Sequence, residues 1–262
     1  LRYVVIDECH TYRGVFGSHL AALLRRLRRV CARYGSYPTF LFASATVRDP
    51  GAHATRLLGM PVAAVTEDGS PREAMTFAMW EPDLLGEGDG RRSATSEAAD
   101  LLATLVSQRV QTVAFAKSRA GVEALATSAR RTLMEVEPAL GGAVAAYRGG
   151  YLPEERRELE RSLRSGAIVG LAATNALELG IDISGLDAVL LAGWPGTRAS
   201  LWQQAGRAGR TGTRSLAVYV AADDPLDTYV VHHPEVVFGQ PVEATVLDPD
   251  NPHVLGPHLA AA

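Results

Sequence analysis

Short apolar runs and helically spaced apolar residues divide the start of the chain into three predicted elements. Uninterrupted apolar runs predict buried strands at Tyr3–Ile6 and Phe40–Ala43. Between them, over about Ser18–Arg33, apolar residues recur every three or four positions, which predicts an amphipathic helix. Two strands separated by a helix are typical of a βαβ unit, so this region predicts a parallel sheet.

The same alternation resumes at residue 97. It predicts helices over 97–108, 119–134 and 153–163 and strands over 112–116, 143–147, 168–173, 188–192 and 216–221. The intervening residues 71–96 are rich in Gly, Asp, Glu and Ser without lasting periodicity, which predicts an exposed linker. We therefore expect an α/β protein with part of a first domain at 1–70 and a second domain at 97–224. Residues 225–262 are expected to be the start of an irregular C-terminal extension.

Composition narrows the class of protein. The chain is 47% apolar and 21% charged, as in soluble globular proteins, and no apolar run approaches the ~18 residues of a membrane span. A net charge of −3 gives no overall basic field, so contact with nucleic acid needs local patches. Cys9 and Cys31 form no CxxC pair, which excludes a thiolate zinc site in this chain.

Two further details concern the origin of the chain. Lysine occurs once, as Lys117, among 26 basic residues, a skew toward arginine that is typical of GC-rich bacterial DNA. The chain also opens within a predicted strand at Leu1, so we expect it to be part of a longer protein. It has no signal peptide pattern. We therefore expect a bacterial cytoplasmic protein.

Asp7 and Glu8 follow the first predicted strand, where open α/β sheets place ligand sites. In a nucleoside triphosphatase, one such carboxylate holds Mg²⁺ through water and the other activates the attacking water. An acidic turn that caps the next segment is the alternative, and the pair by itself favours that alternative.

A second candidate site is the segment 203–210, Gln-Gln-Ala-Gly-Arg-Ala-Gly-Arg. Arg207 and Arg210 are three residues apart, so on a helical turn they would share one face. Guanidinium groups suit triphosphate oxygens because they donate two parallel hydrogen bonds. A basic surface turn is the alternative, but this spacing is more specific than the Asp-Glu pair.

A third candidate is the segment 174–182, which follows a predicted strand. Thr174 and nearby backbone N–H groups could hold a phosphate, and Asp182 could bind a ribose hydroxyl or an arginine. A routine loop in which Gly180 makes a turn explains the segment equally well, so both interpretations remain open.

Taken together, these segments resemble a known family. The segments 7–10, 44–46, 174–182 and 203–210 match motifs II, III, V and VI of superfamily 2 helicases of the DEAD/DEAH-box group, in that order, and 113–123 resembles motif IV. The resemblance implies two RecA-like parallel-sheet domains, of which this chain holds an incomplete first one. It also implies hydrolysis of ATP with Mg²⁺.

A narrower resemblance, to the mitomycin repair factor (MrfA) type of DNA repair helicase, covers nearly all of the chain. The segments that carry it are 6–19, 147–157, 247–252 and 257–259. It implies a 3′-to-5′ DNA helicase that tracks along single-stranded DNA. Zinc is implied only for a C-terminal cysteine cluster, which this chain does not reach.

The resemblance also implies residue roles at the ATP site. Asp7 would bind Mg²⁺ through water, Glu8 would activate the hydrolytic water, and His10 would contact Gln203. Ser44 and Thr46 would couple hydrolysis to domain movement. Residues that would bind the nucleotide are Gly180, Asp182, Arg207 and Arg210.

Nucleic-acid contacts are implied for a second set, namely Lys117, Ser118, Arg119, Arg148 and Thr174. No Gly-Lys pair, and hence no P-loop, occurs in the chain, because Gln111 and Ala116 stand where a P-loop ending at Lys117 would need glycine. We therefore expect the P-loop before Leu1 and no ATPase in this chain alone. An RNA helicase, or a non-catalytic nucleic-acid-binding scaffold that lost its P-loop, remains the alternative.

Overall fold

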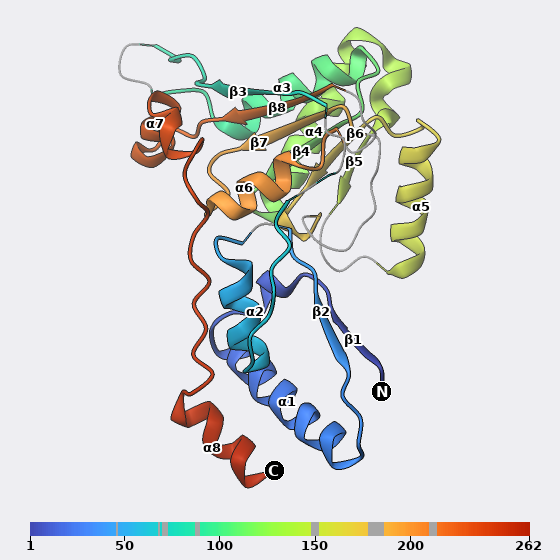
Figure 1. The fold of residues 1–262 in the computed structure, drawn as a ribbon. Helices are drawn as coiled ribbons and strands as arrows, with labels where there is room; N and C mark the ends of the chain where they lie inside the picture. The colour runs from blue at the N-terminus through green and yellow to red at the C-terminus, as the bar shows by residue number, and fades with distance from the viewer. Residues whose placement is uncertain are drawn as a thin grey trace. The chain divides into compact units, whose positions relative to one another are not determined.

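The computed structural model describes residues 1–45, 47–67, 69, 73–86, 90–147, 152–177, 186–209 and 214–262 (Figure 1). The chain forms two compact units. Unit 1 consists of residues 1–69 and 241–262, and unit 2 consists of residues 70–240.

Unit 1 is built on two parallel strands, β1 (Tyr3–Ile6) and β2 (Thr39–Phe42), joined by α1 (Gly14–Arg33). The predicted βαβ unit is confirmed, although α1 begins four residues earlier than Ser18. A second helix, α2 (Pro50–Leu58), starts with Asp49, whose side chain accepts a hydrogen bond from the Ala52 N–H at 2.9 Å. This N-cap and the proline that follows it explain why the helix starts there.

The prediction that both strands are buried is wrong for one face of the pair. Ile6, Phe40 and Phe42 pack on a core that α1 and α2 supply. Tyr3 and Val5 are 65% and 64% exposed. Successive side chains of a strand point to opposite faces, so a core on one side buries only alternate residues.

The C-terminal extension is not irregular, as the sequence had suggested. Its last part forms α8 (Pro252–Ala260) within unit 1, where the Arg26 guanidinium donates to the Ala261 carbonyl at 2.7 Å. Upstream of α8, Leu247 is buried in the unit 1 core, and the Gly14 N–H donates to the Val246 carbonyl at 2.8 Å. A single buried leucine in a proline-rich stretch has no periodicity, so the sequence pattern missed it.

Unit 2 is a six-stranded parallel sheet with strand order β3-β8-β7-β4-β6-β5 (Figure 1). The strands are β3 (Met75–Trp80), β4 (Thr112–Ala116), β5 (Val144–Tyr147), β6 (Gly170–Ala173), β7 (Ala188–Ala192) and β8 (Ser215–Val220). The sequence predicts all of them but β3, and predicts β4 and β7 residue for residue.

The prediction of an exposed linker is wrong for β3. This strand pairs along its whole length with β8, so the second unit begins before residue 97. Phe77 packs on one face of the sheet and Ala78 on the other. The apolar stretch of β3 was not predicted from the sequence because Gly- and acid-rich residues follow it directly.

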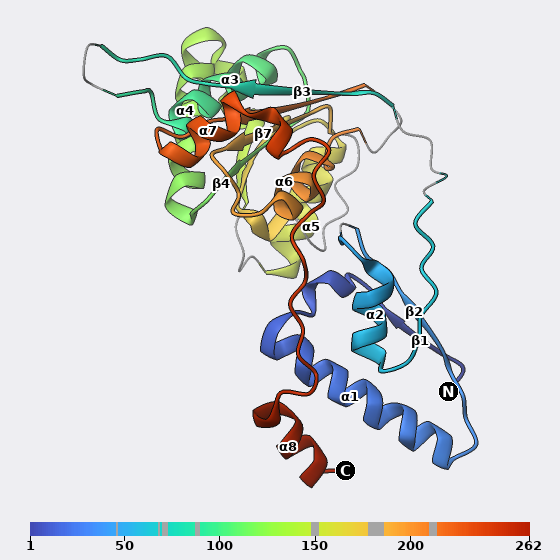
Figure 2. The same ribbon diagram turned by 60° about the vertical axis from the view of Figure 1, so that its left-hand side comes forward.

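Helices cover both faces of this sheet (Figure 2). Their bounds are α3 (Ala94–Ser107), α4 (Arg119–Val136), α5 (Pro153–Arg164), α6 (Arg198–Ala205) and α7 (Pro225–His232). α3 and α4 pack on the face that holds Ala114, whereas α5, α6 and α7 contribute to the face that holds Phe115. α7 lies in the region predicted to be irregular, which is a further correction.

In the part of the chain that the structure describes, no helix has the length and apolar character needed to span a membrane.

Candidate ATP-hydrolysis and nucleic-acid site

Asp7 and Glu8 lie at the carboxyl end of β1, as predicted. Asp7 is exposed, and its Oδ1 accepts a hydrogen bond from the Glu8 N–H at 2.8 Å. Glu8 has φ 49° and ψ 43°, the left-handed conformation, which is uncommon for a residue other than glycine. The Glu8 carbonyl accepts hydrogen bonds from the Thr11 N–H and hydroxyl at 2.9 and 2.8 Å, which holds the turn closed. Backbone strain of this kind clusters at functional sites.

His10 joins the Asp-Glu segment to the end of β2. Its Nδ1 lies 3.4 Å from Glu8 Oε2 and 3.1 Å from Ser44 Oγ. Burial lowers the pKa of His10 below its usual 6.5, and the negative charge of Glu8 opposes this shift only in part. The structure therefore brings three of the predicted residues, Glu8, His10 and Ser44, into one contact network.

His53 on α2 is a member of this site that sequence reasoning missed. Its Nε2 contacts the Cys9 carbonyl at 2.9 Å, and the side chain is buried. The Cys9 N–H in turn donates to the Ala43 carbonyl at 2.9 Å. His53 thus helps hold the backbone between Glu8 and His10. Its only sequence signal is a lone histidine beside buried apolar residues, which is also typical of an ordinary core position.

In unit 2, α6 and the turn after it carry the second constellation. Gln203 is half-buried near the end of α6, whereas Gln204 and Arg207 are buried. α6 ends at Ala205, and Arg207 lies in the turn that follows, where its N–H donates to the Gln204 carbonyl at 3.0 Å. Because Arg210 lies outside the described residues, a shared face of the two arginines stays a prediction. At Gly206 a β-carbon would lie 2.9 Å from the Trp202 carbonyl oxygen, so this turn depends on glycine.

The turn between β4 and α4 exposes three of the predicted nucleic-acid residues together. Lys117, Ser118 and Arg119 are all exposed, and the Ser118 side chain caps α4 by accepting the Gly121 N–H at 3.0 Å. The N-terminus of a helix attracts phosphates because its backbone N–H groups and dipole favour negative charge. The local geometry therefore suits a phosphate contact.

Thr174 follows β6 at the same carboxyl edge of the sheet, but its side chain is buried. The other predicted residues of the two sites lie outside the described residues; they are Thr46, Arg148, Gly180, Asp182 and Arg210. Their roles stay predictions.

A cavity of about 360 Å³ opens beside Lys117 at the carboxyl ends of β4 and β7. Trp194, Asn175 and Gln204 line it together with Asp227 of α7. Asp227 is fully buried, which is rare for a carboxylate, and no sequence motif had singled it out. It became visible only once α7 was seen to pack on this edge of the sheet.

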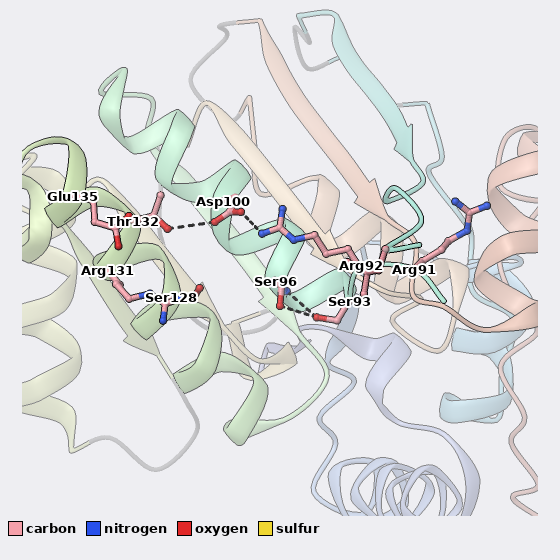
Figure 3. Close-up of a pocket in the computed structure, with 10 residues that line it drawn as sticks. Arg91, Arg92, Ser93, Ser96, Asp100, Ser128, Arg131, Thr132 and Glu135 are labelled. Carbon is pink, nitrogen blue, oxygen red and sulfur yellow. Dashed lines mark hydrogen bonds and ion pairs between the residues drawn. The ribbon is translucent and has the colours of Figure 1, made fainter. Parts of the chain in front are cut away.

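A wider cavity of about 740 Å³ lies between α3 and α4 (Figure 3). Its polar residues largely satisfy one another. Arg92 pairs with Asp100 and with Glu97, and the Thr132 hydroxyl donates to Asp100 Oδ1 at 3.3 Å. It holds none of the residues that the sequence singles out, so size alone does not identify the site.

Comparison with known proteins shows that the chain is similar to ATP-dependent helicases. Residues 96–212 match the family described as "Helicase conserved C-terminal domain". The uncharacterized ATP-dependent helicase YprA of Bacillus subtilis is 45% identical over 264 residues, which cover 100% of this chain and 35% of YprA. The ATP-dependent helicase hrq1 of Schizosaccharomyces pombe is 39% identical over 268 residues, which cover 100% of this chain and 25% of hrq1.

A solved structure agrees with these sequence matches. The crystal structure of the DUF1998 helicase MrfA bound to DNA and AMPPNP superposes with a TM-score of 0.92 at 44% identity, over 99% of this chain and 36% of MrfA. This chain thus spans about a third of the length of YprA and MrfA. The match confirms the RecA-like parallel-sheet fold. The chain is therefore a homologue of the YprA- and MrfA-type helicases, and its residues 96–212 belong to the helicase conserved C-terminal domain family.

Proposed function

We propose that the whole protein is an ATP-dependent 3′-to-5′ DNA helicase that acts in DNA repair in the bacterial cytoplasm, and that this chain supplies part of its motor. The observation that carries the proposal is the contact of His10 with both Glu8 and Ser44. It joins the residue expected to activate water to the residue expected to sense hydrolysis. The named ligands of the MrfA structure, DNA and AMPPNP, support both substrates.

Asp7 fits the role of a magnesium ligand. Mg²⁺ in nucleotide sites keeps several waters and takes one or two carboxylates besides the phosphates. Asp7 is exposed at the end of β1, and its Oδ1 already accepts the Glu8 N–H, so the carboxylate is held in a fixed orientation. When bound with ATP, Mg²⁺ would neutralise phosphate charge, and Asp7 would hold the ion through water.

Glu8 acts as the base that orients and deprotonates the attacking water. The left-handed backbone at Glu8 sets the direction of its side chain, and His10 lies within 3.4 Å of the carboxylate. Because His10 contacts both residues, it can transmit a change in the position or charge of the Glu8 carboxylate to Ser44. In the second domain, Gln203 is the expected partner of His10, and Arg207 with Arg210 neutralises the triphosphate. Lys117, Ser118 and Arg119 bind backbone phosphates of the tracking strand.

The Glu8→Gln variant of the full-length protein tests this assignment. It is expected to lose ATP hydrolysis by at least about a hundredfold while it keeps ATP binding, because only the water-activating group is removed. ATP turnover is measured by the release of phosphate. ATP binding is measured separately, with a fluorescent ATP analogue. Glu67→Gln, an exposed residue of the same unit, is the matched control and should leave both unchanged. Normal turnover in Glu8→Gln would refute the role of Glu8.

The same assay distinguishes the alternatives. Single-stranded DNA should stimulate hydrolysis by the full-length protein more than single-stranded RNA does; the reverse order favours an RNA helicase. Absence of hydrolysis in the full-length protein with either strand favours the scaffold. The 262-residue chain alone is expected to hydrolyse no ATP, because its sequence contains no Gly-Lys pair.

A further inference from the structure

Asp227 connects the ends of two strands beside the exposed turn at Lys117. It lies in the first turn of α7, which Asp224 caps by accepting the Asp227 N–H at 2.9 Å. The Asp227 carboxylate accepts the Trp194 N–H at 3.1 Å, just after β7, and the Ala222 N–H at 2.7 Å, just after β8. One carboxylate thus holds two loops at the carboxyl edge of the sheet.

Gly193 lets this carboxylate face Lys117. It has φ 82°, and a β-carbon built there would lie 2.9 Å from Lys117 Cε, 3.1 Å from Lys117 Nζ and 3.2 Å from Asp227 Oδ2. The space above Gly193 is therefore bordered on one side by the lysine ammonium and on another by the carboxylate. Lys117 is also the single lysine of the chain.

A buried carboxylate is costly unless hydrogen bonds and nearby positive charge compensate for lost water. Asp227 is fully buried and has two backbone donors, and the Lys117 ammonium is a nearby positive charge that borders the same space above Gly193. Among the described residues, Tyr219 and Asp224 are further titratable groups next to it. Burial, and then the negative charge of Asp227, raise the pKa of the Tyr219 hydroxyl, which therefore stays protonated.

We propose that Asp227 is a positioning residue that acts through Lys117: it anchors the loop after β7 and orients the lysine ammonium toward the phosphate of a bound single strand. The proposal rests on the proposed function, in which Lys117 contacts nucleic acid. It adds a residue on α7, outside the helicase motifs, that controls the strength of this contact. Asp227 itself touches no phosphate, because it is buried.

A double-mutant cycle on single-stranded DNA binding by the full-length protein tests the proposal. The probe is a fluorescently labelled oligo-dT, and affinity is read by anisotropy. Lys117→Met and Asp227→Asn are each expected to weaken binding about tenfold, as for loss of one charge-assisted contact. Each should also lower the slope of log affinity against log salt by about 0.7. The double variant should bind like Lys117→Met alone, because Asp227 acts through the lysine.

Two further variants separate positioning from folding. Asp224→Asn removes a carboxylate from the same helix but keeps a good N-cap, so binding should stay within about twofold. Gly193→Ala strains a left-handed residue and also introduces a methyl group against the lysine, so its binding is compared at an equal folded fraction. It is then expected to weaken binding in the wild-type background but not in Lys117→Met. Gly193→Ala also provides the test if Asp227→Asn fails to fold.

Each outcome has a distinct meaning. Additive effects of Asp227→Asn and Lys117→Met, or unchanged or tighter binding by Asp227→Asn, would overturn the positioning role. A Gly193→Ala effect that persists in the Lys117→Met background would also count against it. Failure of the wild-type protein to bind either single-stranded DNA or RNA would instead refute the proposed function.

Discussion

At the scale of single residues, the backbone conformation of Glu8 matters as much as its carboxylate. A left-handed glutamate is held by the bonds from Thr11 to the Glu8 carbonyl, and the Cys9 backbone next to it is held by His53. The sequence predicts which carboxylates lie at the end of β1. It does not predict the φ of Glu8, because the turn is also held by partners that are distant in sequence, His53 on α2 and Ala43 after β2.

The lowered pKa of His10 predicts how the free energy of unfolding of unit 1 depends on pH. The pKa of His10 is lower in the folded state than its usual 6.5. Below about pH 6.5, the unfolded chain therefore binds a proton at His10 more readily than the folded chain does. The free energy of unfolding should therefore fall as pH is lowered through 6.5 toward 5, by no more than about 1.4 kcal/mol per pH unit from this group. At about pH 8 and above, His10 is neutral in both states and contributes almost no slope.

Urea unfolding of the chain at a series of pH values measures this slope. His10→Asn removes the titrating group and should flatten the curve between pH 5 and 6.5. His233→Asn, which changes a histidine of unit 2 that is about half exposed, is the matched control. An unchanged pH slope in His10→Asn would contradict the prediction.

At the scale of elements, the arginines of α1 neutralise the ends of other helices. Arg25 donates to the Arg56 carbonyl at 3.0 Å, and Arg28 donates to the Leu58 carbonyl at 3.0 Å, both at the C-terminus of α2. The last carbonyls of a helix lack intrahelical partners and carry partial negative charge. An arginine-rich helix therefore serves here to dock α2 and, through Arg26, α8.

Replacing Arg28 by Met should destabilise unit 1 by about 1 kcal/mol, because carbonyls at the end of α2 lose a charged donor. Met keeps the length and helix propensity of the side chain. Arg29→Met on the same helix is the control, since Arg29 is exposed, and it should change stability by less than about 0.5 kcal/mol. Equal effects of the two substitutions in denaturant unfolding would show that Arg28 does not stabilise α2.

At the scale of the whole molecule, chain order and spatial order differ. Residues 241–262 belong to unit 1 together with the N-terminal 69 residues, although unit 2 separates them in the sequence. Leu247 is buried among residues of α1 and α2, whereas its neighbour Val246 is 72% exposed. Unit 1 thus includes the last part of the chain.

Leu247→Ala should therefore destabilise unit 1 by about 2–5 kcal/mol, the cost of removing a buried leucine side chain. Hydrogen exchange of α1 and α2 amides reports on unit 1, and exchange of β4 and β7 amides reports on unit 2. Val246→Ala should change neither. Faster exchange confined to unit 2 would contradict the placement of Leu247.

The amino-acid sequence by itself determined what local patterns can encode. Strands β4 and β7 and the helix between the first two strands follow from periodicity. The order of motifs names Asp7, Glu8 and Arg207 as candidate site residues through the family resemblance. Local burial of one element against its neighbours repeats every two or three to four residues, so it leaves a readable signal.

Only the tertiary structure decided which distant residues meet. β3 pairs with β8, whose first residue Ser215 lies opposite Met75, and no pattern near residue 75 names that partner. His53 reaches Cys9, and Asp227 faces Lys117 across Gly193, because sheet topology brings separate elements to one edge. Such contacts depend on the path of the whole backbone rather than on spacing along it, so the sequence could indicate the chemistry of the site but not the residues that hold it in place.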